Sequence, residues 1–527
     1  MSQYEPAEAP FNTDPPTDLD RVLDRTLTAY TDKEIILESD EGMQLRDRLL
    51  LELERIFQEW VKYVAEFVLK LPEDEVAECG GQLFVSGSHR LGIKEPGADI
   101  DTVCVAPNFC TREHFFSSLK ARFLAHPEVT ELSSIETSRV PIIAFDFYGI
   151  SIDLLFAKLA ENCVPPNVDI FNDDILRNLD NASEISLNGP RVTDMIRKLV
   201  PKYDSFVFVL RCVRKWAKVK GLYGNKFGYL GGVNFNLLLA FVCQLYPNAS
   251  PSHLLVRFFR VYSLWKWPAP VMLNKLHPNP PGENRDVWSK EAAHYNRHAN
   301  MMPIITPAYP AANSAYNVSE HTLKVMDNEF RAANDVVRSI VAKKENADWS
   351  RLFTPSDFFI SYNHYLLCHI IGSVTGEDDA EAARGWVGFV ESRLRWVPTI
   401  LAQGLQLSAV HLHPKVVKSD KGTMVSAYYV GFNVAVKGKK GEEKVLRVDQ
   451  CISEFRDQHL GQFRKGEGNV TNTFIVEHFT WKNLPESVFE SLGGKVAAKE
   501  KRRAKFKRTA PAIKVEALAA DTTSTEV

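Results

Sequence analysis

An alternating run of apolar and acidic residues places the strongest constraint on what this chain can fold into. Asp99 and Asp101 stand two residues apart at the start of the apolar run Asp99–Ala106. Because successive side chains of a strand point to opposite faces, both carboxylates project to one side of the sheet. A second apolar run, Gly149–Phe156, carries Asp153 between two apolar residues. If the two runs are neighbouring strands, three carboxylates converge on one face of a small sheet.

Three carboxylates that lie so close repel one another and raise one another's pKa values. A divalent metal ion removes this conflict, and hard oxygen ligands suit Mg²⁺, with Mn²⁺ as an alternative. Gly87 and Ser88 lie upstream: glycine lets the backbone approach a phosphate, and a serine hydroxyl can hydrogen-bond its oxygens. A lone Asp-X-Asp pair is more often a loop or a solvated edge. Gly87-Ser88, the Asp99/Asp101 pair and Asp153, in this order and on expected strands, together predict a metal-dependent site for phosphoryl chemistry.

Composition and length bound the class of protein. A chain of 527 residues predicts about three or four domains. The formal net charge of -3 does not indicate a nucleic-acid partner, so an RNA site depends on local clustering of charge. No apolar run approaches the roughly 20 residues of a membrane helix, so we expect no membrane partner. The eight cysteines form no CxxC pair, which favours a reduced intracellular protein over a zinc ribbon or disulfide framework.

The pattern of apolar residues predicts an α+β chain in five parts. Residues 1–16 are expected to be a flexible leader, and residues 17–161 a mixed-sheet catalytic domain with preceding helices. Residues 162–351 are expected to form a helical middle domain, and residues 352–494 an RNA-recognition-like C-terminal domain. A basic, then polar tail occupies residues 495–527. Its Lys/Arg run is usually a solvated tail, with nuclear import or RNA contact as the alternative.

Each expected domain has its own elements. The catalytic strands are expected at Gly81–Gly87, Asp99–Ala106, Val140–Phe147 and Gly149–Phe156, with a helix at Thr111–Ala125. The middle domain includes the helical runs Tyr203–Lys220 and Gly232–Tyr246 and an irregular, proline-rich segment, Trp265–Tyr316.

The C-terminal pattern is strand, helix, strand, strand, helix, strand, which is the ferredoxin-like order shared by RNA-recognition domains. The expected elements are Phe358–Ile371, Asp379–Val397, Leu405–Leu412, Met424–Val436, Val448–Phe463 and Thr473–Thr480. The aromatic-rich RNP1 string of such domains is absent, so a ferredoxin-like domain with another use stays open. Tyr428, Tyr429 and Phe432 are expected in its core, although one face could stack on bases.

The combination of Gly87-Ser88, the Asp99/Asp101 pair and Asp153 on a later strand resembles the DNA polymerase β-like nucleotidyltransferases. Longer strings narrow the resemblance to eukaryotic nuclear poly(A) polymerases, from about Thr17 to Lys507. The strings are FVSGSHRLG, GADIDTVCVAP, GISIDLLFAKLA, RNLD, SLNGPRVTD, GLYGNKFGYLGGVNF, CQLYPNA, WKWPAPVML and MPIITPAYPAANSAYNVS. The last string, residues 302–319, has no evident catalytic logic, but it separates this family from bacterial, mitochondrial and terminal-uridylyl relatives.

The resemblance implies roles for individual residues. Asp99, Asp101 and Asp153 would be the metal ligands and catalytic residues, and Asp153 would also help to activate an RNA 3′-hydroxyl. Asn188 would face the RNA 3′ end, and Asn225 would reach the adenine. The residues implied to contact the nucleotide are Gly87, Ser88, Arg214, Tyr223, Asn225, Gly231, Gly232 and Val233.

Two features of the residues themselves agree with these roles. The helical run Tyr203–Lys220 leaves Arg211, Arg214 and Lys218 opposite its apolar face, although such a face is usually only solvated. The Gly231-Gly232 pair opens an apolar helix, which would aim N–H groups at an anion; a plain turn is the alternative.

This chain departs from the known relatives at four positions. Ala144 stands where they carry a phosphate-contacting Lys, and Arg214 stands where they carry Lys, which keeps the charge but changes its geometry. Arg139 replaces an aromatic residue near the RNA end, and His89 replaces Tyr. The three aspartates are intact, so these departures bear on ATP and RNA contacts and on whether this is a specialised paralogue.

Two histidine pairs carry weaker signals. His294 and His298 are four residues apart, a spacing found in zinc sites, but no third ligand is evident. His411 and His413 alternate on an expected strand and are expected at the surface. Neither pair predicts a site.

The resemblance therefore implies a nuclear, monomeric enzyme that adds AMP from ATP to RNA 3′ ends. The partners it implies are the RNA 3′ end, ATP and cleavage/polyadenylation factors. Two alternatives remain: a terminal transferase that uses another nucleotide, such as uridylate, or an RNA-binding scaffold of a 3′-processing complex. The intact aspartates argue against the scaffold, and Ala144 is the one feature in its favour.

Overall fold

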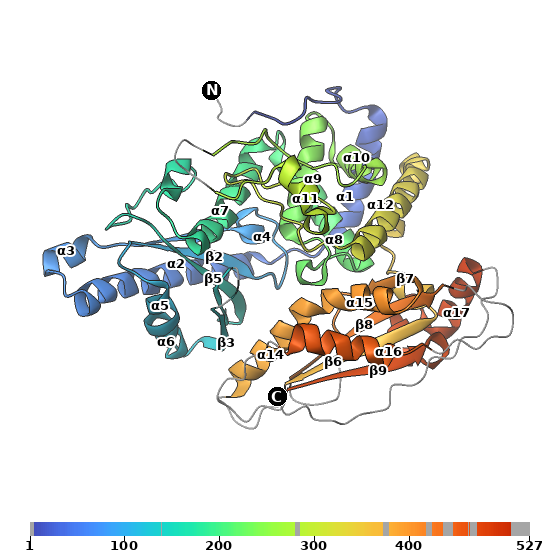
Figure 1. Ribbon diagram of the computed structural model, residues 1–527. Coiled ribbons are helices and arrows are strands. Elements are labelled where there is room, and N and C mark those ends of the chain that lie inside the picture. The colour runs from blue at the N-terminus through green and yellow to red at the C-terminus, as the bar shows by residue number, and fades with distance from the viewer. Residues whose placement is uncertain are drawn as a thin grey trace.

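The computed structural model describes residues 5–136, 138, 140–279, 285–372, 379–417, 424–435, 446–461, 463 and 472–506. Three parts follow one another along the chain and make an α+β protein (Figure 1). A sheet with flanking helices comes first, a helical region second, and a second sheet with its own helices last. Within these ranges, no helix is both long and apolar enough to cross a bilayer.

The first part is built on a five-stranded mixed sheet of order β1-β2-β5-β4-β3. Its strands are β1 (Gln82–Val85), β2 (Ile100–Ala106), β3 (Val129–Ile135), β4 (Ile142–Phe147) and β5 (Ile150–Lys158). Its helices are α2 (Asp40–Tyr63), α3 (Glu73–Glu78), α4 (Gly87–Arg90), α5 (Arg112–His114), α6 (Lys120–Leu124) and α7 (Asn181–Leu199). Four expected strands are thus confirmed, and β3 was not predicted.

The two faces of this sheet pack against different helices. On β2, Ile100 and Cys104 share a core with Trp60 of α2. The alternate residues Val103 and Val105 share a core with Leu187 and other residues on the side of α7. Asp101 has the same parity as Val103 and Val105, so its side chain lies on the α7 face. Strand alternation therefore places Ile100 and Cys104 on the α2 face and Asp101 on the α7 face.

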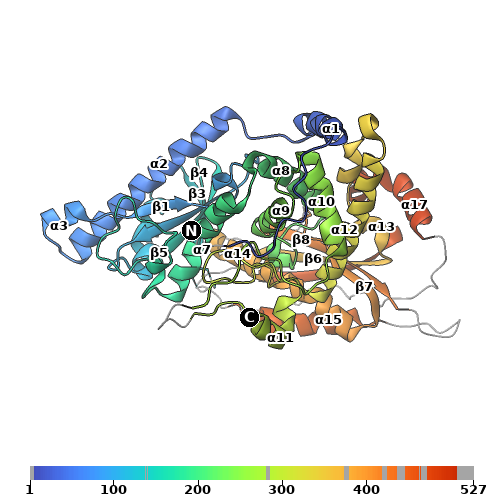
Figure 2. The ribbon, with the colours of Figure 1, turned by 90° about the horizontal axis from the view of Figure 1, so that it is seen from above.

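The second part is a helical bundle that includes a helix from the start of the chain. Its helices are α1 (Asp18–Glu34), α8 (Tyr203–Lys220), α9 (Gly232–Leu245), α10 (Pro251–Leu264), α11 (Lys290–Tyr295) and α12 (Glu320–Val341). Although the sequence groups α1 with the catalytic domain, its Leu23 and Leu27 are buried in the core that holds Trp216 of α8. Figure 2 shows α1 beside α10 and α12, away from the sheet.

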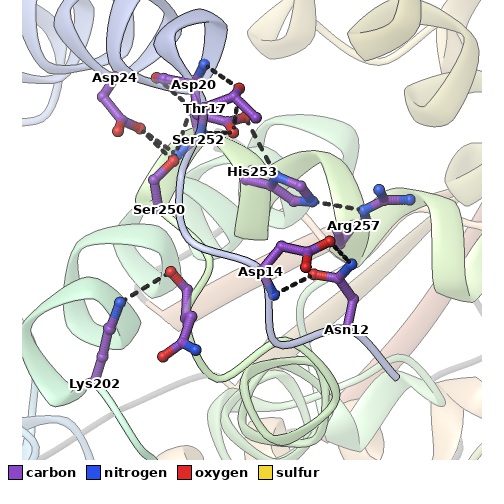
Figure 3. A network of polar contacts seen from close by, with 11 residues as sticks. Asn12, Asp14, Thr17, Asp20, Asp24, Lys202, Ser250, Ser252, His253 and Arg257 are labelled. Atoms are coloured by element: carbon purple, nitrogen blue, oxygen red, sulfur yellow. Dashed lines mark hydrogen bonds and ion pairs between the residues drawn. The ribbon is translucent and has the colours of Figure 1, made fainter. Parts of the chain in front are cut away.

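The N-terminal segment, expected as a flexible leader, runs along this bundle from residue 5 on. The amide N–H groups of Phe11 and Asn12 donate to the carbonyl of Leu245 at 2.8 and 3.1 Å. At the start of α1, the Asp20 carboxylate meets Nδ1 of His253 at 3.2 Å, within the network of polar contacts in Figure 3. These contacts attach the segment to the helical bundle.

The third part is a four-stranded antiparallel sheet of order β7-β8-β6-β9, which is the ferredoxin-like arrangement. Its strands are β6 (His364–Gly372), β7 (Leu407–Leu412), β8 (Met424–Val434) and β9 (Asn472–Thr480). Its helices are α13 (Phe358–Ser361), α14 (Asp379–Arg393), α15 (Val397–Gly404), α16 (Val448–Phe455) and α17 (Gly494–Lys505). One face of the sheet packs on α14, α15 and α16, and the core of the other face includes residues of α13 and α17.

Two expectations in this part are wrong. The strand expected from Phe358 begins at His364, because Phe358–Ser361 forms a helical turn whose phenyl rings pack into the core. His411 is buried rather than exposed, with 7% exposure, since the Phe358 ring packs against it and Tyr362 Oη lies 3.0 Å from its Nδ1. His413 is buried beside the same ring. Tyr428, Tyr429 and Phe432 lie in the core, as predicted.

The third part contacts both others through α14. Lys120 Nζ lies 2.9 Å from an oxygen of Glu381 on α14, and Arg384 donates to the carbonyl of Leu132 on β3 at 3.2 Å. Lys226, in the loop before α9, pairs with Glu391 of α14. These contacts attach the C-terminal part to the part built on the first sheet and to the loop that follows α8.

Candidate active site

The three aspartates of the sequence motif come together on the α7 face of the first sheet. In the parallel pairing of β2 with β5, Asp101 lies directly beside Asp153. Asp99 comes one residue before β2. Carboxylate oxygens of the three residues lie within 4.8 Å of one another. The strand register thus produces the convergence that the alternating pattern predicts.

The electrostatics of this cluster favour a bound cation. Burial, reinforced by the charges of Asp99 and Asp153, raises the pKa of Asp101 to about 7. Burial and the charge of Asp99 raise the pKa of Asp153 to about 6. Each shift records the free-energy cost of ionising one more carboxylate in this place. A divalent metal offsets that cost, and carboxylate oxygens are ligands that hard cations accept, so the residues fit such an ion. Among the described residues, this is the one cluster of three such ligands, and His294 and His298 belong to none.

Gly87 touches the acidic cluster. Its φ of +64° lies in the left-handed region, and a Cβ built there would stand 2.0 Å from Oδ2 of Asp101. Its N–H donates to Oγ1 of Thr193 on α7 at 3.3 Å. Ser88 follows it in the short helix α4 and is buried. The glycine is therefore required by a close approach to a candidate metal ligand.

Asn188 lies on α7, near the Gly87 loop. Its neighbour Gly189 approaches Ser86, whose Oγ would be 3.2 Å from a Cβ at residue 189. Asn188 itself is half-buried. Farther along α7, Oγ1 of Thr193 accepts a hydrogen bond from the N–H of Gly87. The helix thus contacts the Gly87 loop directly after Asn188 in sequence, at Gly189, and again at Thr193.

Arg214 of α8 extends toward the same face. It is 7% exposed, and its charge acts on the carboxyl of Asp101. Its Nη2 lies 2.9 Å from Oε2 of Glu95, and Lys218 pairs with the other oxygen of Glu95. Within the described residues, the buried Nε of Arg214 has no hydrogen-bond partner. Arg214, whose charge reaches Asp101, and Lys218 thus share the carboxylate of Glu95.

Arg211, expected on the same basic face, is used differently. Its guanidinium donates to the carbonyls of Ile93 and Gly92 at 2.8 and 3.1 Å. These bonds hold the loop between α4 and β2, which carries Glu95. Arg211 is therefore a support of the loop, whereas Arg214 and Lys218 face Glu95.

Tyr223 and Gly232 complete this corner. The Tyr223 ring centroid lies 5.4 Å from Cζ of Arg214 and 5.0 Å from Nζ of Lys218. A Cβ at Gly232 would stand 2.9 Å from Oη of Tyr223 and 3.1 Å from Nη1 of Arg214. Burial raises the pKa of Tyr223, so the phenol stays a neutral hydrogen-bonding group. The start of α9 is thus packed directly against Arg214 and Tyr223.

The loop before α9 holds Asn225 and Gly231. A Cβ at Gly231 would lie 3.5 Å from Cβ of Asn225, and the Gly231 N–H donates to Oδ1 of Asn234 at 2.7 Å. Val233, in the first turn of α9, is 37% exposed. Asn317 contacts Asn225 through two hydrogen bonds. Contacts thus link Asn225, through Gly231 and Gly232, to Tyr223 and Arg214.

The departures from the family pattern have the following places. Ala144 on β4 pairs with Asp153 in the antiparallel register of β4 and β5. Nε2 of His89 lies 3.8 Å from the Asp47 carboxylate, and burial lowers the pKa of His89. Arg139 lies outside the described residues.

Two parts of the site were missed by reasoning from sequence. Glu95 lies inside the motif stretch that contains Asp99. Nothing in the sequence indicates that this acidic residue pairs with Arg214 and Lys218 of α8. The string 302–319 has no catalytic logic that the sequence alone reveals. In the structure its Asn317 and Ser314 bond to Asn225 and Asn234, so it supports the loop before α9. Its length and its resemblance to the family's string were the signal available.

Family models match most of the chain. A model of the poly(A) polymerase nucleotidyltransferase domain matches residues 8–200, and one of the poly(A) polymerase central domain matches residues 205–355. A third, the poly(A) polymerase predicted RNA binding domain, matches residues 357–423. The three models follow the three structural parts in order.

Curated relatives carry the same name. Nuclear poly(A) polymerase 1 of Arabidopsis thaliana is 39% identical over 85% of this chain, and nuclear poly(A) polymerase 4 of the same plant is 38% identical over 91%. Poly(A) polymerase of Dictyostelium discoideum is 36% identical over 91% of this chain. The chain spans 61%, 63% and 58% of the lengths of these three relatives, respectively.

Solved structures show a more distant similarity. A structure of Cid1, an RNA terminal uridylyl transferase, is 15% identical, with a TM-score of 0.46, and covers 64% of this chain and 99% of that one. The polymerase core of TRAMP, an RNA surveillance complex, is 17% identical, with a TM-score of 0.41, and covers 63% of this chain and 91% of that one.

Proposed function

Because the chain belongs to the poly(A) polymerase family, we propose that it adds AMP from ATP to RNA 3′ ends without a template. The observation that carries this proposal is the register that sets Asp101 beside Asp153, with Arg214 next to them. This arrangement supports the proposal, because it would put acidic ligands for a metal ion near a cation for the triphosphate. The reaction joins the RNA 3′-oxygen to the α-phosphorus of ATP and breaks the bond to the leaving pyrophosphate.

Asp99, Asp101 and Asp153 are the residues that would hold Mg²⁺, or Mn²⁺, and act in catalysis. Such ions neutralise charge on the transferring phosphoryl group and on the leaving oxygen. Asp153 lies on the strand next to Ala144, and it would activate the RNA 3′-hydroxyl for attack. The raised pKa values of Asp101 and Asp153 support this assignment, because a bound cation would offset the burial and the carboxylate repulsion that cause them.

The nucleotide would lie between the Gly87 loop and the start of α9. Gly87 and Ser88 would hold the triphosphate through backbone N–H and hydroxyl groups. Arg214 would bind phosphate oxygens with its guanidinium, and Tyr223 would stay beside it as a neutral hydroxyl. The contacts to the nucleoside are assigned to Asn225, Gly231, Gly232 and Val233.

The RNA would meet the enzyme at Asn188 on α7 and at the C-terminal domain. We propose that the catalytic domain extends through α7 to about residue 200. The middle domain, with α1 packed on it, would end at 351/352, and the C-terminal domain would include α17. We further propose a monomer that works in the nucleus with cleavage/polyadenylation factors. Relatives named nuclear poly(A) polymerases support the location.

One experiment tests the proposed activity. The purified protein is incubated with a short RNA, one nucleoside triphosphate at a time, and Mg²⁺ or Mn²⁺. We expect extension with ATP and far less with UTP, CTP or GTP. Equal use of ATP and UTP would replace adenylate transfer by a less selective terminal transfer. Absence of extension with all four would leave an RNA-binding scaffold.

A further inference from the structure

The amide of Asn225 is held by two partners from the segment 302–319. Nδ2 of Asn317 donates to Oδ1 of Asn225 at 2.6 Å and to the backbone carbonyl of Asn225 at 3.2 Å. On the other side, Nδ2 of Asn225 donates to the backbone carbonyl of Ser314 at 3.4 Å. The side chain is therefore bonded at both ends of its amide.

These partners determine which way the amide faces. A backbone carbonyl can only accept, so the Asn317 atom beside it must be the nitrogen. The Asn225 atom that the same nitrogen meets must then be the oxygen. The Ser314 carbonyl, which also only accepts, independently requires the nitrogen of Asn225 on its side. A flipped Asn225 amide would lose both bonds.

The amide nitrogen faces the start of α9. The Asn225 atoms that approach a Cβ built at Gly231 are its Cβ, at 3.5 Å, and its Nδ2, at 3.9 Å. Gly232 follows, and a Cβ there would meet Tyr223 and Arg214. The amide nitrogen thus lies beside Gly231, which is assigned to the nucleotide, and one of its two hydrogens is used by Ser314. The amide oxygen faces Asn317.

We propose that Asn317 is a positioning residue that presents the amide of Asn225 to the nucleotide as a hydrogen-bond donor. This inference rests on the proposed function, since it needs a nucleoside at Asn225. A donor recognises a ring nitrogen that carries a lone pair, and adenine offers such atoms at N1, N3 and N7. Asn225 would otherwise be free to turn either end of its amide to a base. Asn317 thereby fixes Asn225 as a hydrogen-bond donor, and not an acceptor, toward the base.

The test compares ATP with 1-deaza-, 3-deaza- and 7-deaza-ATP, using the full chain and a short RNA. Each analogue replaces one ring nitrogen by C–H. The wild type should lose about tenfold in kcat/KM with one of the three, as expected for one hydrogen bond. In Asn317→Ala, KM for ATP should rise, kcat should change little, and the penalty for that analogue should shrink to about twofold or less.

Asn225→Asp is the matched second variant. Its carboxylate can still accept from Asn317, so the local contact survives, but it has no N–H to donate. It should lose the same analogue discrimination as Asn317→Ala. Thermal unfolding of each variant shows whether it is folded. If Asn317→Ala does not fold, Asn225→Asp still tests whether the Asn225 N–H causes the analogue discrimination.

The outcomes separate the two claims. Failure of the wild type to add adenylate would overturn the proposed function. Adenylate addition with no analogue penalty would overturn only this inference, as would an Asn317→Ala protein that keeps the wild-type discrimination.

Discussion

Ala144 lies directly across from Asp153 in the antiparallel pairing of β4 with β5. Directly opposed side chains share a face and have Cβ atoms about 4.5–5.5 Å apart. Ala144, where the family resemblance implies a Lys, is therefore a cross-strand neighbour of a candidate metal ligand. A cation at residue 144 would reach the space next to the three aspartates.

Ala144→Lys should tighten ATP binding about tenfold, because a charge-assisted contact to a phosphate would be added. Ala144→Met, of similar length and without charge, is the control. ATP affinity is read from KM in the extension assay and from direct binding. Equal affinity in the Lys and Met variants would show that the Ala144 position does not reach the triphosphate.

Glu95 holds the two cations that the triphosphate would need. Burial alone would raise the pKa of Glu95, but Arg214 and Lys218 outweigh it and keep the pKa below its usual value. Glu95→Gln should therefore lower KM for ATP by about threefold to tenfold, because the cations lose a competing anion. Arg214→Ala should raise KM severely. If Glu95→Gln also raises KM, the carboxylate positions Arg214 instead of competing with ATP.

The acidic cluster should make the metal-free protein sensitive to pH. An aspartate in the unfolded chain has a pKa of about 3.9, whereas Asp101 in the folded protein has a pKa of about 7. The folded state thus binds an extra proton between these values, so stability falls as pH rises through this window. In EDTA, Asp101→Asn should melt above the wild type at about pH 8, and the difference should vanish as pH approaches about 4.

Mg²⁺ should reverse that order. The ion stabilises the wild type by binding the folded state, and Asp101→Asn should gain much less. Identical melting curves of the two proteins across this pH range, with and without Mg²⁺, would exclude a strained carboxylate cluster.

Much of the site could be predicted because strand alternation is a local property. Asp99 and Asp101 share a face whatever the rest of the chain does, and Asp153 on an apolar run has one plausible orientation. The parallel register of Asp101 with Asp153 depends on the whole sheet and could not be predicted. The edge strand β3 was missed because its sequence, VTELSSI, is mostly polar and its pairing with β4 is irregular.

Other misses have tertiary causes. His411 looks like a surface residue on its strand, but α13, remote in sequence, brings Phe358 against it. The segment 302–319 acts largely through Asn and Ser side chains and backbone carbonyls, whose partners are set by the packing of α9 and not by any periodic pattern.

The basic C-terminal helix has two kinds of cations, which mutations can separate. Arg502 donates to the carbonyls of Ile360 and Tyr362, both at 2.8 Å, whereas Lys499 and Arg503 are exposed. Arg502→Gln should destabilise the protein by about 1–3 kcal/mol, because buried acceptors lose a charged donor. Arg503→Gln should leave the melting temperature unchanged.

Nuclear import can be tested with the same residues. A reporter fused to the segment Lys499–Arg508 should enter the nucleus, and neutralising Lys499 and Arg503 should disperse it. Residues from Lys507 on lie outside the described part of the chain. A reporter that stays cytoplasmic with the intact segment would contradict an import role.

The central claim is that Asp99, Asp101 and Asp153 together carry adenylate transfer. Its most direct measurement is the rate of RNA extension with ATP and Mg²⁺ by the wild type and by each single Asp→Ala variant. The variants should stay folded, because removing one carboxylate relieves repulsion, and each should retain less than about a tenth of wild-type activity. A folded single variant that extends RNA at the wild-type rate would contradict the claim for that residue.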